Sequence, residues 1–132
     1  ERGSQRVSSA FAGVSDALPA LARAQAIGER AARAGLDYGD LDSAWDQVEK
    51  DLRHLRAAAE PEDQERYLGE ALFALANLAR WLNTDAESAL REATIRFVAR
   101  VRAFEEEALA AGRELTRPDM VTLWQRMRGD GT

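Results

Sequence analysis

Two apolar repeats, separated by one short break, dominate the chain between residues 42 and 82. In each repeat apolar residues recur every three or four positions, which is the spacing of one helical face. The break, Glu60-Pro61-Glu62, is so short that the second helix must turn back antiparallel to the first. The predicted inner faces are Leu41, Trp45, Val48, Leu52 and Leu55 on the first helix, and Leu68, Ala71, Leu72, Leu75, Leu78 and Leu82 on the second.

Helix starts and stops elsewhere are marked by proline, glycine and capping residues. Ser15 or Asp16 is the expected cap of a helix that precedes the hairpin, and Gly35 is its expected stop. Asp40 or Asp42 is the expected cap of the first hairpin helix. The predicted helices lie at about residues 17–34, 41–59, 61–82, 85–110 and 117–128.

Strand-like alternation of apolar and polar residues is missing from the whole sequence. The predicted fold is therefore all-α, a bundle of four main helices with a short fifth C-terminal helix. We predict a flexible linker over residues 1–16, one helical domain over 17–128 and a disordered tail over 129–132. Because the chain begins at Glu1 instead of Met, we expect it to be a piece of a longer protein.

Composition excludes several classes of function. The net charge of −5 argues against nucleic-acid binding, which needs a basic surface to neutralise phosphates. No apolar run approaches the roughly 20 residues that a membrane span requires, and no secretory leader is visible, so we expect a cytoplasmic protein without a membrane partner. The absence of cysteine excludes disulfides and thiolate metal sites.

Polar residues along the hairpin are the candidates for chemistry. Asp51 and His54 lie three residues apart on the first helix, and Tyr67 and Glu70 lie three apart on the second. Residues at this spacing share a helix face, and the antiparallel turn brings the two pairs together at the core edge. Asp51, His54 and Glu70 could there hold a divalent cation. The alternative is a solvated polar face, because such spacing is common on charged helices.

Several stretches of the chain resemble one family. Residues 17–21 with 31–38, residues 67–80 and residues 89–102 are similar, in order and spacing, to a MazG-type nucleoside triphosphate pyrophosphohydrolase domain. The resemblance extends from Leu18 to Trp124. Its Leu-Pro-Ala-Leu lead-in is most similar to the C-terminal copy in members with two such domains.

The resemblance implies an obligate dimer or higher homo-oligomer that cleaves nucleoside triphosphates to monophosphate and pyrophosphate. It further implies magnesium held by glutamates spaced E-E-x-x-E on one helix and E-x-x-D on the next. Clustered carboxylates of this kind hold the cations that neutralise the triphosphate and activate water.

The family's metal motif is degenerate in this chain. Lys50 occupies the first glutamate position, Asp51 the second and His54 the third. Tyr67 occupies the glutamate position of the second helix, and Glu70 replaces its aspartate. We therefore assign no catalytic residue among these five positions and expect no cofactor. If the domain is active, it would require magnesium or manganese. Lys50 would oppose a nearby cation; it either pairs with Asp51 or Glu70 or points into solvent.

Other positions could bind nucleotide. The family's asparagine and lysine on the fourth helix correspond to Thr94 and Arg96, and Tyr38 stands where the family has tryptophan. Arg30 is a further phosphate-binding candidate. Ile95 and Val98 lie off the apolar stripe of their helix, which suggests a subunit interface.

Three functions are open on this evidence. The first is a catalytically degenerate MazG-like domain that dimerises, regulates an active domain on the same parent protein, or does both. The second is an active pyrophosphohydrolase that uses magnesium or manganese at Asp51, His54 and Glu70. The third is a bundle that binds nucleotide without cleaving it.

Overall fold

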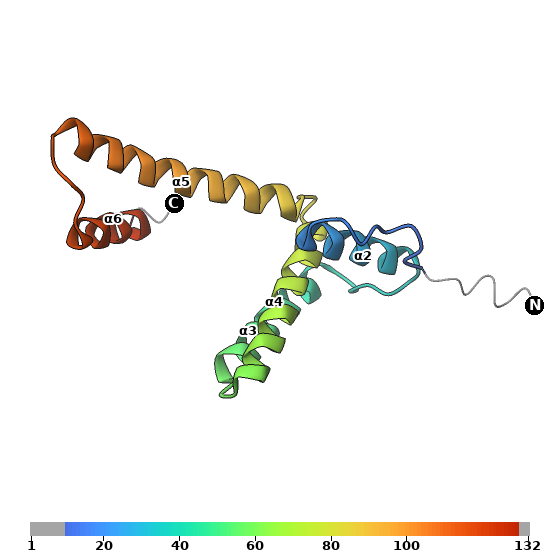
Figure 1. The fold of residues 1–132 in the computed structure, drawn as a ribbon. Coiled ribbons are helices and arrows are strands. Elements are labelled where there is room, and N and C mark those ends of the chain that lie inside the picture. Colours follow the sequence, from blue (N-terminus) through green and yellow to red (C-terminus); the bar gives the residue numbers. More distant parts are fainter. Residues whose placement is uncertain (1–9, 130–132) are drawn as a thin grey trace, which may run out of the picture. The chain divides into compact units, whose positions relative to one another are not determined.

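The computed structural model describes residues 10–129, and every regular element in that range is an α-helix (Figure 1). The prediction of an all-α fold is confirmed. Residues 1–9 of the predicted linker and residues 130–132 of the predicted tail lie outside the described residues. The helices are α2 (Ala20–Arg33), α3 (Leu41–Ala57), α4 (Pro61–Trp81), α5 (Ala86–Ala110) and α6 (Arg117–Gly129).

The described chain divides into two compact units, residues 10–89 and residues 90–129. In the first unit α2 and α3 each pack against α4, and α3 and α4 form the predicted hairpin (Figure 1). In the second unit α6 turns back toward α5 (Figure 1). There the ring centroids of Phe97 and Trp124 lie 6.0 Å apart, nearly perpendicular to each other.

Local side-chain chemistry sets most helix ends. The Asp40 side chain accepts a hydrogen bond from the Ser43 backbone N–H at 2.8 Å, so the predicted cap of α3 is confirmed. Pro61 occupies the first turn of α4, where its missing N–H leaves no helical hydrogen bond unmade. At α6, Thr116 and Asp119 cap each other's backbone N–H groups reciprocally.

The predicted start of the first helix is wrong. Helix α2 begins at Ala20, its N-cap is Pro19, and no side chain caps it. Proline disfavours helical backbone at the residue before it, so the helix cannot extend back through Leu18. Asp16 instead forms an exposed ion pair with Arg23 at 3.1 Å.

The buried face of α3 differs from the predicted stripe. Helix α3 buries Ala44, Val48 and Asp51, whereas Trp45 and Leu52 are 43% and 47% exposed. Ala44 and Val48 pack with Ala74 and Leu78 of α4 in the core cluster of the first unit. Small side chains at this contact let the two helices approach closely, which turns the larger residues outward.

Helix α4 has a similar mismatch. The residues that it buries are Ala71, Ala74, Ala76, Asn77 and Leu78. Four leucines that the repeat predicts as core are between 43% and 49% exposed, and we call them the leucine row: Leu68, Leu72, Leu75 and Leu82. Because α4 contacts α2 on one side and α3 on another, the leucine row is left on a third side that neither helix covers.

Helix α5 buries Ala108, whereas none of the residues in the apolar stripe predicted for this helix is buried: Ala86, Leu90, Ala93, Phe97, Val101 and Phe104. Leu90 and Phe97 are 53% and 44% exposed. Ile95 and Val98 are also exposed, as the sequence predicts. Long stretches of α5 thus carry apolar side chains that the second unit itself does not cover.

The difference between the predicted and the observed stripe of α3 is testable with two substitutions. Val48→Ala removes two buried carbons and should lower the free energy of unfolding by about 1.5 kcal/mol. Leu52→Ala removes exposed surface and should change it by less than about 0.5 kcal/mol. Urea denaturation followed by circular dichroism measures both. If both variants lost the same free energy of unfolding at every protein concentration, Leu52 would be as buried as Val48, as the apolar repeat predicts.

Candidate functional site

The hairpin brings together some of the predicted site residues. The ring centroids of His54 on α3 and Tyr67 on α4 lie 5.0 Å apart, with a 50° angle between the ring planes. The Arg66 guanidinium lies 4.7 Å from the centroid of the Tyr67 ring and donates a hydrogen bond to its hydroxyl. An aromatic and cationic cluster therefore occupies this part of the hairpin.

Asp51 lies inside the first unit. It is 6% exposed, and its Oδ1 accepts a hydrogen bond from Gln47 Nε2 at 3.1 Å. One turn of α3 thus supplies both the carboxylate and the amide that satisfies it. The Asp51 carboxylate is a buried, hydrogen-bonded acceptor and not an open ligand on the surface.

Lys50 lies on the exposed side of α3. It is exposed and lines a shallow surface hollow of about 250 Å³ with Tyr38, Asp46 and Gln47. Among residues 10–129, no ion pair joins Lys50 to Asp51 or Glu70. The hypothesis that Lys50 pairs with one of these acids is therefore wrong in this structure, and the solvent-directed alternative describes it.

Glu70 faces a different hollow. It is exposed on α4 beside Glu62, Glu65, Arg66 and Phe73, around an open volume of about 700 Å³. Across the part of the chain that the structure describes, no three His, Cys, Asp or Glu side chains come close enough to hold a metal ion. Asp51, His54 and Glu70 do not converge as three ligands.

Arg30 is not free to bind a phosphate. Its Nη1 donates hydrogen bonds to the backbone carbonyls of Ala10 and Ala12. These bonds attach the end of the predicted linker to α2. The role predicted for Arg30 in phosphate binding is not supported, because the guanidinium already has acceptors in its own chain.

Thr94 and Arg96 lie on α5, in the second unit. The Thr94 hydroxyl donates a hydrogen bond to the Leu90 carbonyl at 2.9 Å, the common arrangement of a threonine inside a helix. Arg96 is exposed and forms no ion pair within residues 90–129. Of these two candidates, Arg96 presents the open cationic group.

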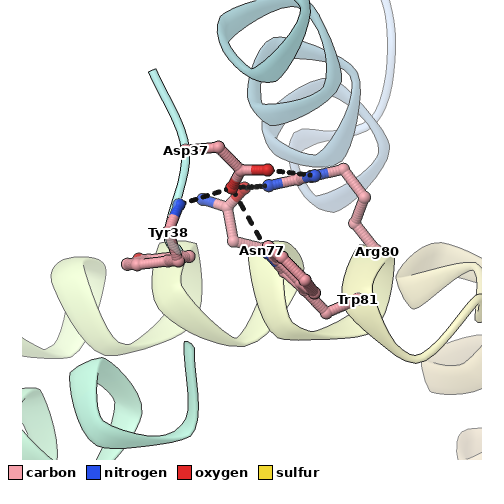
Figure 2. Close-up of polar contacts among 5 residues, drawn as sticks. All are labelled: Asp37, Tyr38, Asn77, Arg80 and Trp81. Carbon is pink, nitrogen blue, oxygen red and sulfur yellow. Dashed lines mark hydrogen bonds and ion pairs between the residues drawn. The ribbon is translucent and has the colours of Figure 1, made fainter. Parts of the chain in front are cut away.

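A polar network that the repeat pattern does not reveal joins the loop before α3 to α4 (Figure 2). Both terminal nitrogens of Arg80 donate to the Asp37 carboxylate, at 2.7 and 3.2 Å. Trp81 Nε1 donates to the same carboxylate at 3.3 Å. The Arg80 and Asp37 side chains are only 15% and 23% exposed. This bidentate pair fixes the loop that carries Tyr38.

The network shifts the pKa values of its acidic groups. The Arg80 hydrogen bonds hold the pKa of Asp37 below its ordinary value of 3.8, against the opposing effect of burial. Burial raises the pKa of Tyr38 above its ordinary value of 10.0, and the negative charges of Asp51 and Asp37 add to that rise. Asp37 is therefore the charged partner of Arg80 at neutral pH, and Tyr38 is a neutral phenol.

Asp37 and Arg80 are 43 residues apart, and for that reason sequence reasoning missed them. One signal was available. Asn77 and Arg80 interrupt an otherwise apolar run of α4 at helical spacing, which favours a shared buried partner.

A cavity of about 260 Å³ adjoins this network in the first unit. Its wall combines α2, the loop before α3 and α4. The lining residues include Gly28, Leu36, Tyr38, Phe73, Asn77 and Arg80.

Comparison with known proteins identifies the family. No protein-family model matches the chain. Among curated proteins, the chain is 35% identical over 132 residues to the nucleoside triphosphate pyrophosphohydrolase/pyrophosphatase MazG of Thermotoga maritima, covering 98% of this chain and 51% of that protein. It is 35% identical over 136 residues to the nucleoside triphosphate pyrophosphohydrolase of Escherichia coli K12, covering 97% and 52%.

The chain is a MazG-type domain. It spans about half the length of the curated relatives that it matches. The family resemblance seen in the sequence is thereby confirmed. No helix of this MazG-type domain within residues 10–129 is long and apolar enough to cross a membrane.

The donors in this MazG-type domain do not fit the family's magnesium site. Magnesium prefers oxygen ligands in an octahedral arrangement, supplied mainly by carboxylates and water. The five motif positions offer two carboxylates, of which Asp51 is buried and hydrogen-bonded and Glu70 faces the hollow beside Arg66. Lys50, His54 and Tyr67 supply an ammonium, an imidazole and a phenol.

The Asp37–Arg80 pair should stabilise the fold in a pH-dependent way. Arg80→Gln should lower the free energy of unfolding by about 2 kcal/mol at pH 7, because a largely buried, charge-assisted pair is lost. Since the pKa of folded Asp37 is lowered, its contribution is complete above 3.8 and is lost as the pH falls through the folded value. The difference between wild type and variant should therefore shrink in acid.

Thermal or urea unfolding measures this trend across roughly pH 2–7, the interval over which a carboxyl group titrates. Arg66→Gln is the matched control, because its ion pair with Asp63 spans 3.9 Å between exposed side chains. That control should change stability by less than about 0.5 kcal/mol. A loss in Arg80→Gln that stayed constant over the acid range would contradict the assigned role of Asp37.

Proposed function

We propose that this chain is a catalytically degenerate MazG-like domain that dimerises and regulates an active nucleoside triphosphate pyrophosphohydrolase domain on the same parent protein. One observation carries the proposal. Where the family has a metal-binding glutamate, the chain has Lys50, exposed and without an ion pair to Asp51 or Glu70.

Charge at this position opposes a metal ion directly. Replacing a carboxylate by an ammonium changes the local charge by two units. Two like unit charges about 4 Å apart repel by roughly 4 kcal/mol at an effective dielectric of 20. An exposed ammonium is partly screened, but it supplies none of the attraction that the lost glutamate gave to magnesium.

The neighbouring positions offer no compensation. Asp51 is buried and accepts a hydrogen bond from Gln47, and the His54 and Tyr67 rings contact each other. Clustered carboxylates are what a triphosphate–magnesium substrate requires. The two helices of the hairpin nevertheless pack through a buried cluster of Ala44, Val48, Ala74 and Leu78, which supports a role that depends on the scaffold.

The leucine row supports dimerisation. Its four side chains recur along one side of α4 and are each more than 40% exposed. Contiguous exposed apolar surface of this kind marks interaction sites. We propose that a second copy of the chain covers the leucine row in a symmetric homodimer, because closed two-fold assemblies are the commonest homo-oligomers.

The regulatory role is inferred from the share of each curated relative that this chain matches. The matched region makes up about half of each curated relative, so in those proteins it is joined to a further segment of similar size. A scaffold without a metal site, linked to such a segment, would act on it by assembly or by ligand binding. We propose that this chain has an active domain of the same family as its partner.

Turnover by the isolated chain is the first test. With magnesium or manganese and each common nucleoside triphosphate, the wild-type chain should release no pyrophosphate above background, because its metal ligands are gone. A coupled pyrophosphate assay measures this. Release that disappears in both Asp51→Ala and Glu70→Ala, with folding checked by circular dichroism, would instead establish an active enzyme.

A second test addresses the dimer. Leu72→Glu with Leu75→Glu places two charges in the leucine row, so the mass in solution should fall from a dimer to the 14.6 kDa of one chain. Light scattering after size-exclusion chromatography measures the mass. Leu109→Glu is the control, because Leu109 is 79% exposed on α5, outside the leucine row. If the double variant stayed dimeric, the leucine row would not be the dimer interface.

A further inference from the structure

Residues 10–16, which we call the strap, are held on α2 by two arginines (Figure 1). Arg30 Nη1 donates hydrogen bonds to two backbone carbonyls of the strap, and Arg23 Nη2 pairs with Asp16 Oδ1 at 3.1 Å. Because Arg23 and Arg30 are seven positions apart, about two helical turns, they lie on one side of α2. The strap therefore follows that side of the helix.

The strap turns sharply next to Arg30. Gly13 has a φ of 90°, a backbone conformation that glycine adopts easily and other residues rarely adopt. The Val14 N–H donates to the Phe11 carbonyl at 3.1 Å and closes the turn. A Cβ at position 13 would lie 3.4 Å from Arg30 Nη2, so the guanidinium lies directly against the turn. Arg30 thus holds a folded segment in place.

The opposite side of α2 holds the corner between α4 and α5, residues 82–86. Gln25 is two positions from Arg23 and faces the other way, since successive helical residues turn about 100°. Gln25 Nε2 donates to the Thr84 carbonyl, and Gln25 Oε1 accepts from the Ala86 N–H, both at 2.8 Å. Ala86 is the first residue of α5, where the helix itself offers no acceptor to an N–H. One carboxamide of α2 therefore bonds both polar groups of the corner.

Helix α2 depends on its neighbours to stay folded. It has 14 residues, no side chain caps its start, and within residues 20–33 only Gly28 is buried. A helix of this length is marginal in water on its own, so its stability comes from what it packs against. Gly28 lies so close to α4 that a Cβ there would collide with Asn77 Oδ1. The strap and the corner thus stabilise the same short helix from opposite sides.

The strap is held less firmly than the number of its bonds suggests. The Asp16 side chain is 94% exposed, so its ion pair with Arg23 contributes little. Arg23 Nε is buried and has no hydrogen-bond partner among residues 10–129. Opening around Arg23 would return this donor to water, which offsets part of the bonding that is lost. The contact of the strap with α2 is therefore a reversible one, held mainly by Arg30.

We propose that α2 couples the strap to the corner, so that displacing residues 10–16 from Arg30 loosens α2 and frees the contacts of Gln25 with Thr84 and Ala86. The reason is cooperativity, because a short helix that loses contacts on one side opens as a unit. A force or a partner acting on the strap would thereby change how firmly α5 is held at its start. This coupling is a property of the chain itself and does not rest on the proposed regulatory function.

Amide hydrogen exchange of the full chain, followed by NMR at single residues, tests the coupling. Arg30→Met keeps the aliphatic stem and removes the donors. The Ala86 N–H should then exchange roughly tenfold faster than in wild type, the equivalent of one lost charge-assisted hydrogen bond.

Arg33→Met is the matched control, because Arg33 is exposed and both arginines lie in the last turn of α2. Both substitutions remove a favourable charge from the same helix end, and this effect alone should change exchange only about twofold.

Gly13→Ala perturbs the strap without altering α2. Alanine is strained at a φ of 90°, so the strap should leave Arg30 more often and Ala86 should exchange about fivefold faster. Gly112→Ala is its control, because Gly112 also has a positive φ but belongs to the second unit. That control should leave the exchange of Ala86 unchanged.

The proposal is overturned if Ala86 in either Arg30→Met or Gly13→Ala exchanges no faster than in the matching control. If Arg30→Met lost its helical content in circular dichroism, Gly13→Ala alone would decide. Faster exchange of Ala86 in the strap variants, with both controls near wild type, establishes the coupling.

Discussion

Close approach of α2 and α3 to α4 is the constraint on which the first unit depends. The buried residues of α4 are mostly alanines, and Gly28 supplies the buried position of α2. Small side chains bring helix axes near each other and gain dispersion contacts over the whole backbone surface. The cost is a thin core, in which no large side chain among residues 10–89 is fully buried. Polar contacts such as the Asp37–Arg80 pair therefore matter more here than in a leucine-filled bundle.

Because the core buries few large side chains, many apolar side chains remain exposed on the surface. The leucine row of α4 and the open side chains of α5 are too extensive to be the scattered exposed apolar residues of an ordinary monomer. Their exposure follows from the same small-residue contacts, since a helix that meets its neighbours through alanine must turn its leucines elsewhere. The sequence is rich in leucine, but a single chain buries few of its leucines. The proposed assembly with a second copy would bury them.

Lys50 and the network at Asp37 illustrate two uses of charge. At Lys50 the charge is exposed, so it disfavours a cation without contributing much to stability. At Arg80 the charge is enclosed, paired and bidentate, so it fixes a loop and neutralises a cavity wall. The two helices of the hairpin thus carry one exposed charge, on α3, and one enclosed and paired charge, on α4.

Helix positions and ends were determined by the sequence itself, because they depend on neighbours within a few residues. The 3.6-residue repeat, the Asp40 cap and Pro61 act locally, and each gave the element that the structure contains. The start of α2 could also have been read correctly from Pro19, by the restriction that proline places on the residue before it.

Only the tertiary structure decided which face of each helix is buried. Val48 and Leu52 belong to one apolar stripe, yet they differ tenfold in exposure because α4 meets α3 at Ala44 and Val48 (4% against 47%). The Asp37–Arg80 pair and the Gly28–Asn77 contact join residues more than 40 positions apart, beyond the reach of any local pattern. Their partners are set by how three helices pack, and packing depends on side-chain volumes that periodicity does not measure.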